Sequence, residues 1–174
     1  VNDGNTGTAT QVVVVTITGT NDMPTIEGTA TGAVQEDIAV VNGDLVATGT
    51  GTFDDLDLTD VHTLSAARTP TTSVVWNGGT PSAAQLAAFV AGFDAQIDDQ
   101  ADDTWSWDYT IDNSLVQFLA AGETITMSFT VTVNDGNTGT ATQVVVVTIT
   151  GTNDMPTIEG TATGAVQEDI AVVN

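Results

Sequence analysis

The sequence predicts an all-β fold, an antiparallel β-sandwich with one inserted short helix. Two segments, 105–111 and 125–133, alternate strictly between large apolar and small polar residues, which is the period of a half-buried strand. Several other short Thr- and Val-rich runs are separated by Gly, Asn and Asp turns, as in antiparallel sandwiches. Only residues 81–93 have a helical period.

The chain contains an internal repeat. Residues 1–42 return without a change as 133–174, an offset of 132 residues. A self-match at fixed spacing is typical of tandem arrays. We therefore expect a segment of a longer chain of like domains: 1–22 as the C-terminal strand and linker of a preceding repeat, 23–154 as one complete repeat, and 155–174 as the start of the next. Residues 1–20 should be poorly ordered alone, pair with a neighbouring molecule, or belong to a continuous array.

The first half of the repeat reads as short strands. One or two are expected within 25–41, a Thr/Gly strand at 44–52, and further strands at 61–67 and 73–76. In the helical segment, Ser82 and Gln85 have the spacing of a capping box. Its apolar residues recur at helical intervals, so we expect about three turns packed on a sheet; they are Leu86, Phe89, Val90 and Phe93.

The second half is more regular. Strands are expected at 105–111, 125–133 and 140–150, with a single helical turn at 114–119. The last strand is apolar at consecutive positions 144–147, so it should be central or covered on both faces.

Charge restricts the partners. The chain has 23 acidic residues and one basic residue, Arg68, for a net charge of −22. Nucleic acid and anionic membranes need Lys and Arg, so neither is expected as a partner. No segment is long enough to insert into a membrane. Crowded carboxylates favour hard divalent cations instead.

The inventory of reactive side chains argues against an enzyme. His62 is the only histidine and there is no cysteine. A glycosidase would need two carboxylates across a sugar cleft. Asp108 lies beside Trp105 and Trp107, but alternation places these two indoles on the face opposite Asp108, in the core.

The acidic residues gather in the predicted loops, and here the chain resembles known repeats. The run VTVNDGNTGTATQVVVVTITGTNDMP is similar to the end of a cadherin domain. PTIEGTATGAVQED, DLDLTDVHTLS and WSWDYTIDNSLVQFLAAGETITMSFTVTVNDG resemble the VCBS-type, cadherin-like repeats of giant bacterial RTX-type adhesins. The likeness covers most of the 132-residue period, with 69–103 as an insertion, and implies a cadherin/Ig-like sandwich.

The resemblance implies Ca²⁺ at each junction between repeats. The upper domain would supply Glu36, Asp112, Asn153 and Asp154, and the lower domain Asp55, Asp57 and Asp135. At the first junction the linker residues Asn21 and Asp22 would lie beside the ligands of the lower domain, Asp55, Asp57 and Asp135. The linker reads Thr-Asn-Asp-Met-Pro and 112–114 reads Asp-Asn-Ser instead of Asp-Arg-Glu, which favours one or two ions per junction. Loop Asp and Asn also occur simply because they suit turns, and the acidic stretch 94–103 reads as solvated surface.

The resemblance implies an extender repeat of a large secreted cell-surface adhesin, exported by type I secretion and serving cell adhesion and biofilm. Its partners would be the adjacent repeats of the same chain. Two alternatives stay open: a subunit of a head-to-tail extracellular filament with strand exchange between neighbours, and a calcium-dependent carbohydrate-binding module with a glycan partner.

Overall fold

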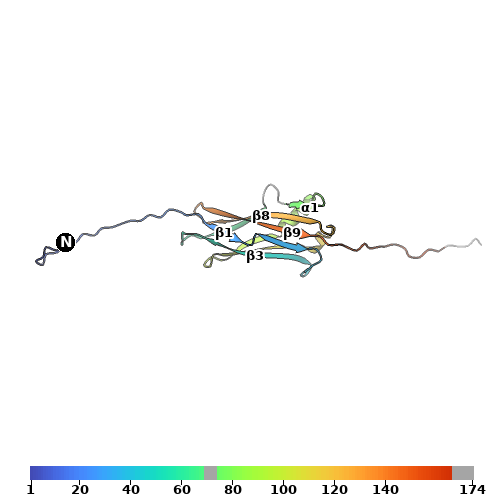
Figure 1. Cartoon of the computed structure of the whole chain (residues 1–174), viewed down its shortest axis with the longest axis horizontal. Helices are drawn as coiled ribbons and strands as arrows, with labels where there is room; N and C mark the ends of the chain where they lie inside the picture. The colour runs from blue at the N-terminus through green and yellow to red at the C-terminus, as the bar shows by residue number, and fades with distance from the viewer. Residues whose placement is uncertain (69–73, 166–174) are drawn as a thin grey trace, which may run out of the picture.

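The computed structural model describes residues 1–68 and 74–165 and contains two β-sheets packed face to face (Figure 1). The predicted all-β sandwich with one short helix is confirmed. All the strands lie between Thr25 and Thr150, and the chain enters the sandwich at one end and leaves it at the other (Figure 1). Among the described residues no helix has the length and apolar character to cross a membrane.

The first sheet is antiparallel throughout. Its order is β1 (Thr25–Gly28), β3 (Asp44–Asp54), β7 (Thr104–Asp112) and β6 (Phe93–Asp99). In the second sheet β2 (Thr31–Gln35), β9 (Thr140–Thr150), β8 (Thr124–Asn134) and β4 (Thr63–Arg68) follow in that order, and β5 (Val74–Trp76) also pairs with β8.

One strand pair corrects the expectation of a purely antiparallel sandwich. β2 pairs with β9 in parallel, with Thr31 opposite Val146 and Gln35 opposite Thr150. Only two residues separate β1 from β2, so the chain crosses from one sheet to the other without reversing its direction. The stretch 25–41, where one or two strands were expected, therefore contains two, separated by Thr29 and Ala30.

The alternating strands supply the core as predicted. Every apolar residue at the odd positions of β7 and β8 is buried, namely Trp105, Trp107, Tyr109 and Ile111, and Ile125, Met127, Phe129, Val131 and Val133. β9 lies between β2 and β8, so its predicted central position is confirmed. Val145 and Val147 are fully buried while Val144 is 45% exposed, which means that only one face of β9 is covered.

The Thr/Gly composition of β3 has a packing cause. Gly49 is opposite Trp107 and Gly51 is opposite Trp105 in the β3–β7 register. A side chain at either glycine would collide with the facing indole ring. The freed space lets Trp105 Nε1 donate to the Glu27 carbonyl at 3.0 Å and lets Trp107 Nε1 donate to the Thr29 carbonyl at 2.9 Å.

The inserted helix α1 (Ala83–Ala91) starts at the predicted capping box and is shorter than the expected 81–93. Ser82 Oγ accepts from the Gln85 amide, and Gln85 Oε1 accepts from the Ser82 amide at 2.9 Å. Phe93 already belongs to β6, a strand that the sequence analysis missed. Its inward residues alternate with exposed acidic and amide side chains, and the acidic stretch concealed that pattern. The predicted turn at 114–119 is the 3₁₀ helix η1 (Asn113–Leu115).

The two copies of the repeated stretch adopt different structures. Residues 140–150 form β9, whereas the identical residues 8–18 form no strand and Val12 to Val15 are 77–85% exposed. Residues 157–165 form no strand, whereas the identical residues 25–33 include β1 and the start of β2. Ser73 of the expected strand 73–76 and residues 166–174 of the expected next repeat lie outside the described residues.

We predict that Gly51→Ala destabilises the sandwich by about 1–3 kcal/mol, because the added methyl group overpacks the space against Trp105 and the Glu27 carbonyl. Urea unfolding measures this loss. Gly19→Ala is the control, since nothing lies within 4 Å of its added Cβ. Equal effects of the two substitutions would contradict the packing explanation.

Candidate functional site

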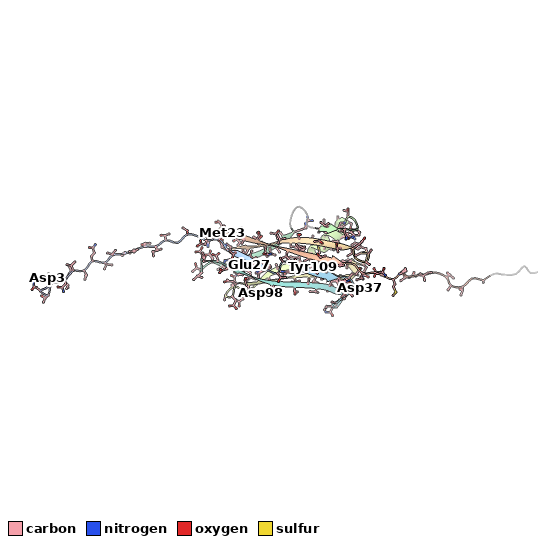
Figure 2. All side chains as sticks on the ribbon, viewed as in Figure 1. Asp3, Met23, Glu27, Asp37, Asp98 and Tyr109 are labelled. Carbon is pink, nitrogen blue, oxygen red and sulfur yellow. The ribbon has the colours of Figure 1, made fainter. Side chains whose placement is uncertain are left out.

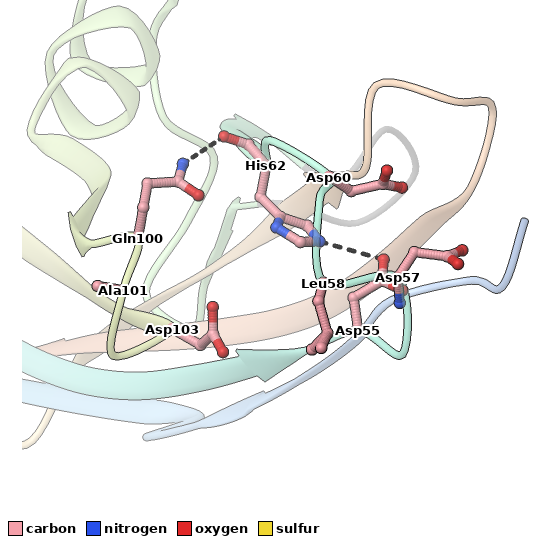
Figure 3. Close-up of a pocket in the computed structure, with 8 residues that line it drawn as sticks. All are labelled: Asp55, Asp57, Leu58, Asp60, His62, Gln100, Ala101 and Asp103. Atoms are coloured by element: carbon pink, nitrogen blue, oxygen red, sulfur yellow. Dashed lines mark hydrogen bonds and ion pairs between the residues drawn. The ribbon is translucent and has the colours of Figure 1, made fainter.

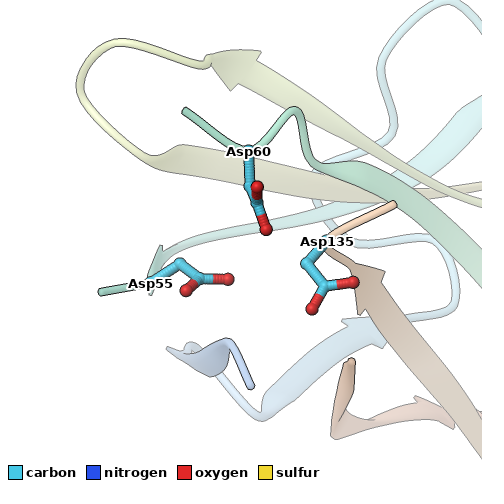
Figure 4. A group of neighbouring side chains, drawn as sticks. All are labelled: Asp55, Asp60 and Asp135. Atoms are coloured by element: carbon cyan, nitrogen blue, oxygen red, sulfur yellow. The ribbon is translucent and has the colours of Figure 1, made fainter. Parts of the chain in front are cut away.

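Three carboxylates meet at the end where the chain enters the sandwich, called the entry end below. Asp55, Asp60 and Asp135 each offer an oxygen, and these oxygens lie within 4.8 Å of one another (Figure 4). Asp55 and Asp60 lie in the loop after β3, and Asp135 directly follows β8. Two strands of different sheets therefore deliver the cluster.

The Asn-Asp-Gly-Asn-Thr-Gly turn holds Asp135 in place. Its Oδ1 accepts from the amides of Asn137 at 2.7 Å and Gly139 at 2.9 Å, and a Cβ at Gly139 would occupy the position of the carboxylate. The pKa of Asp135 is lowered, chiefly by the Asn21 side chain that donates to it and also by these amides. Asp135 is 1% exposed, so a buried, ionised carboxylate is fixed at this position.

The β3–β4 loop presents the other two carboxylates. Asp55 Oδ1 accepts from the Asp57 amide at 3.0 Å, and its Oδ2 lies 3.1 Å from Nε2 of His62. Asp60 Oδ1 accepts from the Asn137 side chain at 2.8 Å. Asp60 Oδ2 is buried, and none of the described residues forms a hydrogen bond with it.

The N-terminal linker closes over this cluster. Asn21 Nδ2 donates to Asp135 Oδ2 at 2.9 Å, and the Asp22 amide donates to Asp57 Oδ2 at 2.7 Å. The structure thus brings together the five residues expected at the first junction: Asn21, Asp22, Asp55, Asp57 and Asp135.

A cavity of about 230 Å³ lies beside Asp55 and Asp57 (Figure 3). Its lining also includes Asp60, His62 and Asp103, none of which was predicted from the sequence to belong to the site. Asp60 belongs to the same acidic run as Asp55, but no spacing distinguishes it from a solvated turn residue. Asp103 comes from the β6–β7 loop, so part of the acidic stretch read as solvated surface lines this cavity.

A second acidic group lies at the opposite end, the exit end, where Asp37 is labelled near the departing chain (Figure 2). Glu36 directly follows β2 and is 0% exposed. Its Oε2 accepts from the Thr152 amide at 2.9 Å, and its buried Oε1 has no hydrogen-bond partner within residues 1–68 and 74–165. Burial raises the pKa of Glu36, and the charges of Asp154 and Asp37 raise it further.

Asp112 directly precedes the 3₁₀ helix η1. Its Oδ1 accepts from the Ser114 amide at 2.8 Å and caps η1, and this bonding to Ser114 lowers its pKa. The carboxylates that act on Glu36 are Asp154 and Asp37. Asp37 accepts from the side chains of Asn113 at 2.7 Å and Gln117 at 2.9 Å. Asn153 lies in the departing linker beside Asp154, and its side chain donates to the Asp154 carbonyl.

The donor set fits a hard divalent cation. Calcium binds oxygen at 2.3–2.6 Å, so two of its ligands can be up to about 5 Å apart. The oxygens of Asp55, Asp60 and Asp135 meet this limit. Asp60 Oδ2 and Glu36 Oε1 are buried carboxylate oxygens that lack a partner in the part of the chain that the structure describes, and such groups are costly unless a cation or a donor reaches them.

Comparison with known proteins gives distant structural likeness alone. No protein-family model matches the chain, and no curated protein matches it. Among solved structures, the chain is similar to AggA, the major subunit of aggregative adherence fimbriae type I from Escherichia coli. The identity is 16% and the TM-score is 0.45, over 76% of this chain and 97% of that one. At these values the likeness carries no argument about function.

We predict a pH dependence from Glu36 in cation-free buffer. Its folded-state pKa lies above the ordinary value of 4.5, so the folded state retains the proton longer than the unfolded state. The unfolding free energy should therefore fall as pH rises above about 4.5 and level off above the raised pKa. Glu36→Gln should be more stable than the parent at pH 7.5 but show no such advantage near pH 4. Denaturant unfolding at both pH values measures this, with the exposed Glu27→Gln as control; equal behaviour of the two variants would refute the assignment.

Proposed function

We propose that the chain is an extender repeat of a large secreted cell-surface adhesin, stiffened by calcium at the junctions between repeats. Its role is mechanical and not catalytic: it holds a distal adhesive domain away from the cell. Cell adhesion and biofilm formation would be the context, outside the cell after type I secretion.

One observation carries this proposal, the contacts of the repeated linker. In the second copy, the Thr152 amide donates to Glu36 of the domain that the chain leaves. In the first copy, Asn21 and Asp22, which correspond to Asn153 and Asp154, donate to Asp135 and Asp57 of the domain that the chain enters. Since the copies are identical, three consecutive residues join an exit end to an entry end.

This short linker would crowd negative charge in a tandem chain. Three residues span at most about 10 Å, close to the Debye length of about 8 Å at physiological salt. Glu36, Asp37 and the linker Asp of one repeat would then face Asp55, Asp57, Asp60 and Asp135 of the next. Two like charges 4 Å apart repel by about 1 kcal/mol in water and by about 4 kcal/mol near a protein surface.

Calcium would convert this repulsion into a bridge. The ligands would be Asp55, Asp60 and Asp135 with Asp57 and the linker on one side, and Glu36 on the other. A bound ion would tie both domains to one linker and fix the angle between them. Extracellular calcium modules have a Kd of about 10⁻⁴–10⁻³ M, which matches calcium outside cells and leaves the site empty in a low-calcium cytoplasm.

Thermal unfolding of the 174-residue chain tests the calcium site. A tenfold excess of calcium over Kd adds about 1.4 kcal/mol, so Tm should rise by about 5 °C between EDTA and millimolar calcium. Asp60→Asn and Asp135→Asn should abolish the rise, and equal magnesium should not reproduce it.

Asp98→Asn is the matched control, because Asp98 is an exposed acid of β6 outside the cluster. Its response to calcium should equal that of the parent chain. No shift in the parent chain, or the same loss in all three variants, would overturn the calcium site.

A chain extended through a second complete repeat tests the mechanical role. Strands of 11 residues at about 3.3 Å per residue give a domain roughly 36 Å long. Small-angle X-ray scattering should show one extended two-domain shape in calcium and a broader distribution of sizes in EDTA. An unchanged distribution would leave a calcium site without a stiffening role.

A filament subunit is the second candidate, and the exposed first copy of β9 favours it. Residues 12–15 are four consecutive exposed valines, and their second copies pair with both β2 and β8. Such a segment could complete the sheet of a neighbouring molecule. In that case the apparent mass of the 174-residue chain would rise with concentration, whereas an extender segment would keep a constant mass.

A further inference from the structure

Both ends of the sandwich expose large apolar side chains on their loops. At the entry end, Leu56 is 76% exposed and Leu58 is 95% exposed, and these two leucines flank Asp57. At the exit end, Leu115 is 45% exposed and Phe118 is 38% exposed. Leucine side chains offer no ligand to a cation, and large apolar side chains that are exposed close together are a candidate contact surface.

The exit end also carries a hollow of about 250 Å³. It is lined by residues 117–121 of the β7–β8 loop and by residues 152–154 of the departing linker. Phe118, Leu119 and two alanines supply its apolar side. The hollow therefore lies at the base of the linker, where a following repeat would begin.

The linker contacts both the hollow and the loop that carries Leu56 and Leu58. Asp154 lines the hollow, and its first copy, Asp22, donates its amide to Asp57 at 2.7 Å. In a tandem chain one Asp would make both contacts. Its hydrogen bond to Asp57 would hold the neighbouring Leu56 and Leu58 of the following repeat beside the hollow of the preceding one.

We propose that Leu56 and Leu58 of each repeat dock into the hollow lined by residues 117–121 of the repeat before it. The occupant is thus the next copy of this same domain. The contact is apolar and supplements the cation bridge of the proposed function, on whose tandem arrangement it rests. It would add a second point of contact beside the cation bridge, and the two contacts together would fix the rotation of one repeat about the long axis of the other.

The absence of cysteine from the chain allows a clean test of position. In the two-repeat chain, Ala121→Cys in the first repeat and Leu58→Cys in the second form the inward pair. The reversed arrangement, Leu58→Cys in the first repeat and Ala121→Cys in the second, forms an outward pair at the two far ends. We expect an intramolecular disulfide in most inward-pair molecules under mild oxidation, and none in the outward pair. Equal yields, or no disulfide in the inward pair, would overturn the proposal.

The stability of the two-repeat chain provides a second test. Leu56→Ser with Leu58→Ser in the second repeat should lower Tm by roughly 3–6 °C, since it removes a buried contact. The identical double substitution in the first repeat, where the leucines face solvent, should change Tm by less than about 1 °C. Equal shifts at the two positions would also overturn the docking.

The outcomes separate this inference from the calcium proposal. If calcium does not stiffen the parent but the inward pair cross-links, the calcium bridge fails and the apolar contact stands. If calcium stiffens the chain while the inward pair does not cross-link and the two serine variants behave alike, the apolar contact alone fails.

Discussion

The crossing of the chain from one sheet to the other decides at which end of the sandwich Glu36 lies. Trp105 and Trp107 of β7 reach across two glycines of β3 and donate to the carbonyls of Glu27, near the end of β1, and Thr29, in the crossing itself. The chain is thereby held in one direction from β1 to β2 and delivers Glu36 to the exit end. Without that support β1 and β2 would have a single edge pairing each, and short edge strands are weakly held.

The acidic residues at the two ends of the domain share one kind of position in the fold. They follow directly after strands: Glu36 after β2, Asp55 after β3 and Asp135 after β8. Strand direction then divides them between two ends of one domain. Buried carboxylate oxygens without partners, at Glu36 and Asp60, cost stability in an isolated domain. The proposed cation and neighbouring domain would supply partners for these oxygens.

The sequence was informative wherever one face of a strand is buried. The alternation in β7 and β8 predicted every inward side chain, since a half-buried strand admits only one phase. It failed for β6, whose exposed acids concealed the alternation of Phe93, Ala95 and Ile97. It also failed for the parallel β2–β9 pair, because strand direction depends on a crossing that leaves no periodic signal. Asp60 and His62 joined the acidic site only through the path of the β3–β4 loop.

The repeated stretch separates local from tertiary determination within one molecule. In both copies the turn forms in the same way: Asp3 Oδ1 accepts from the amides of Asn5 and Gly7, as Asp135 Oδ1 does from Asn137 and Gly139. Gly4 and Gly136 share a positive φ of 84° and 81°. These hydrogen bonds span at most four residues, so the sequence by itself determines the turn.

The strand that follows the turn depends on contacts with other segments. Residues 140–150 are β9 because β8 and β2 supply hydrogen bonds on both sides and the core accepts Val145 and Val147. The identical residues 8–18 have no such neighbours among the described residues and remain exposed. A strand's backbone bonds and buried surface come from other segments, so only the tertiary structure decides whether this sequence is a strand.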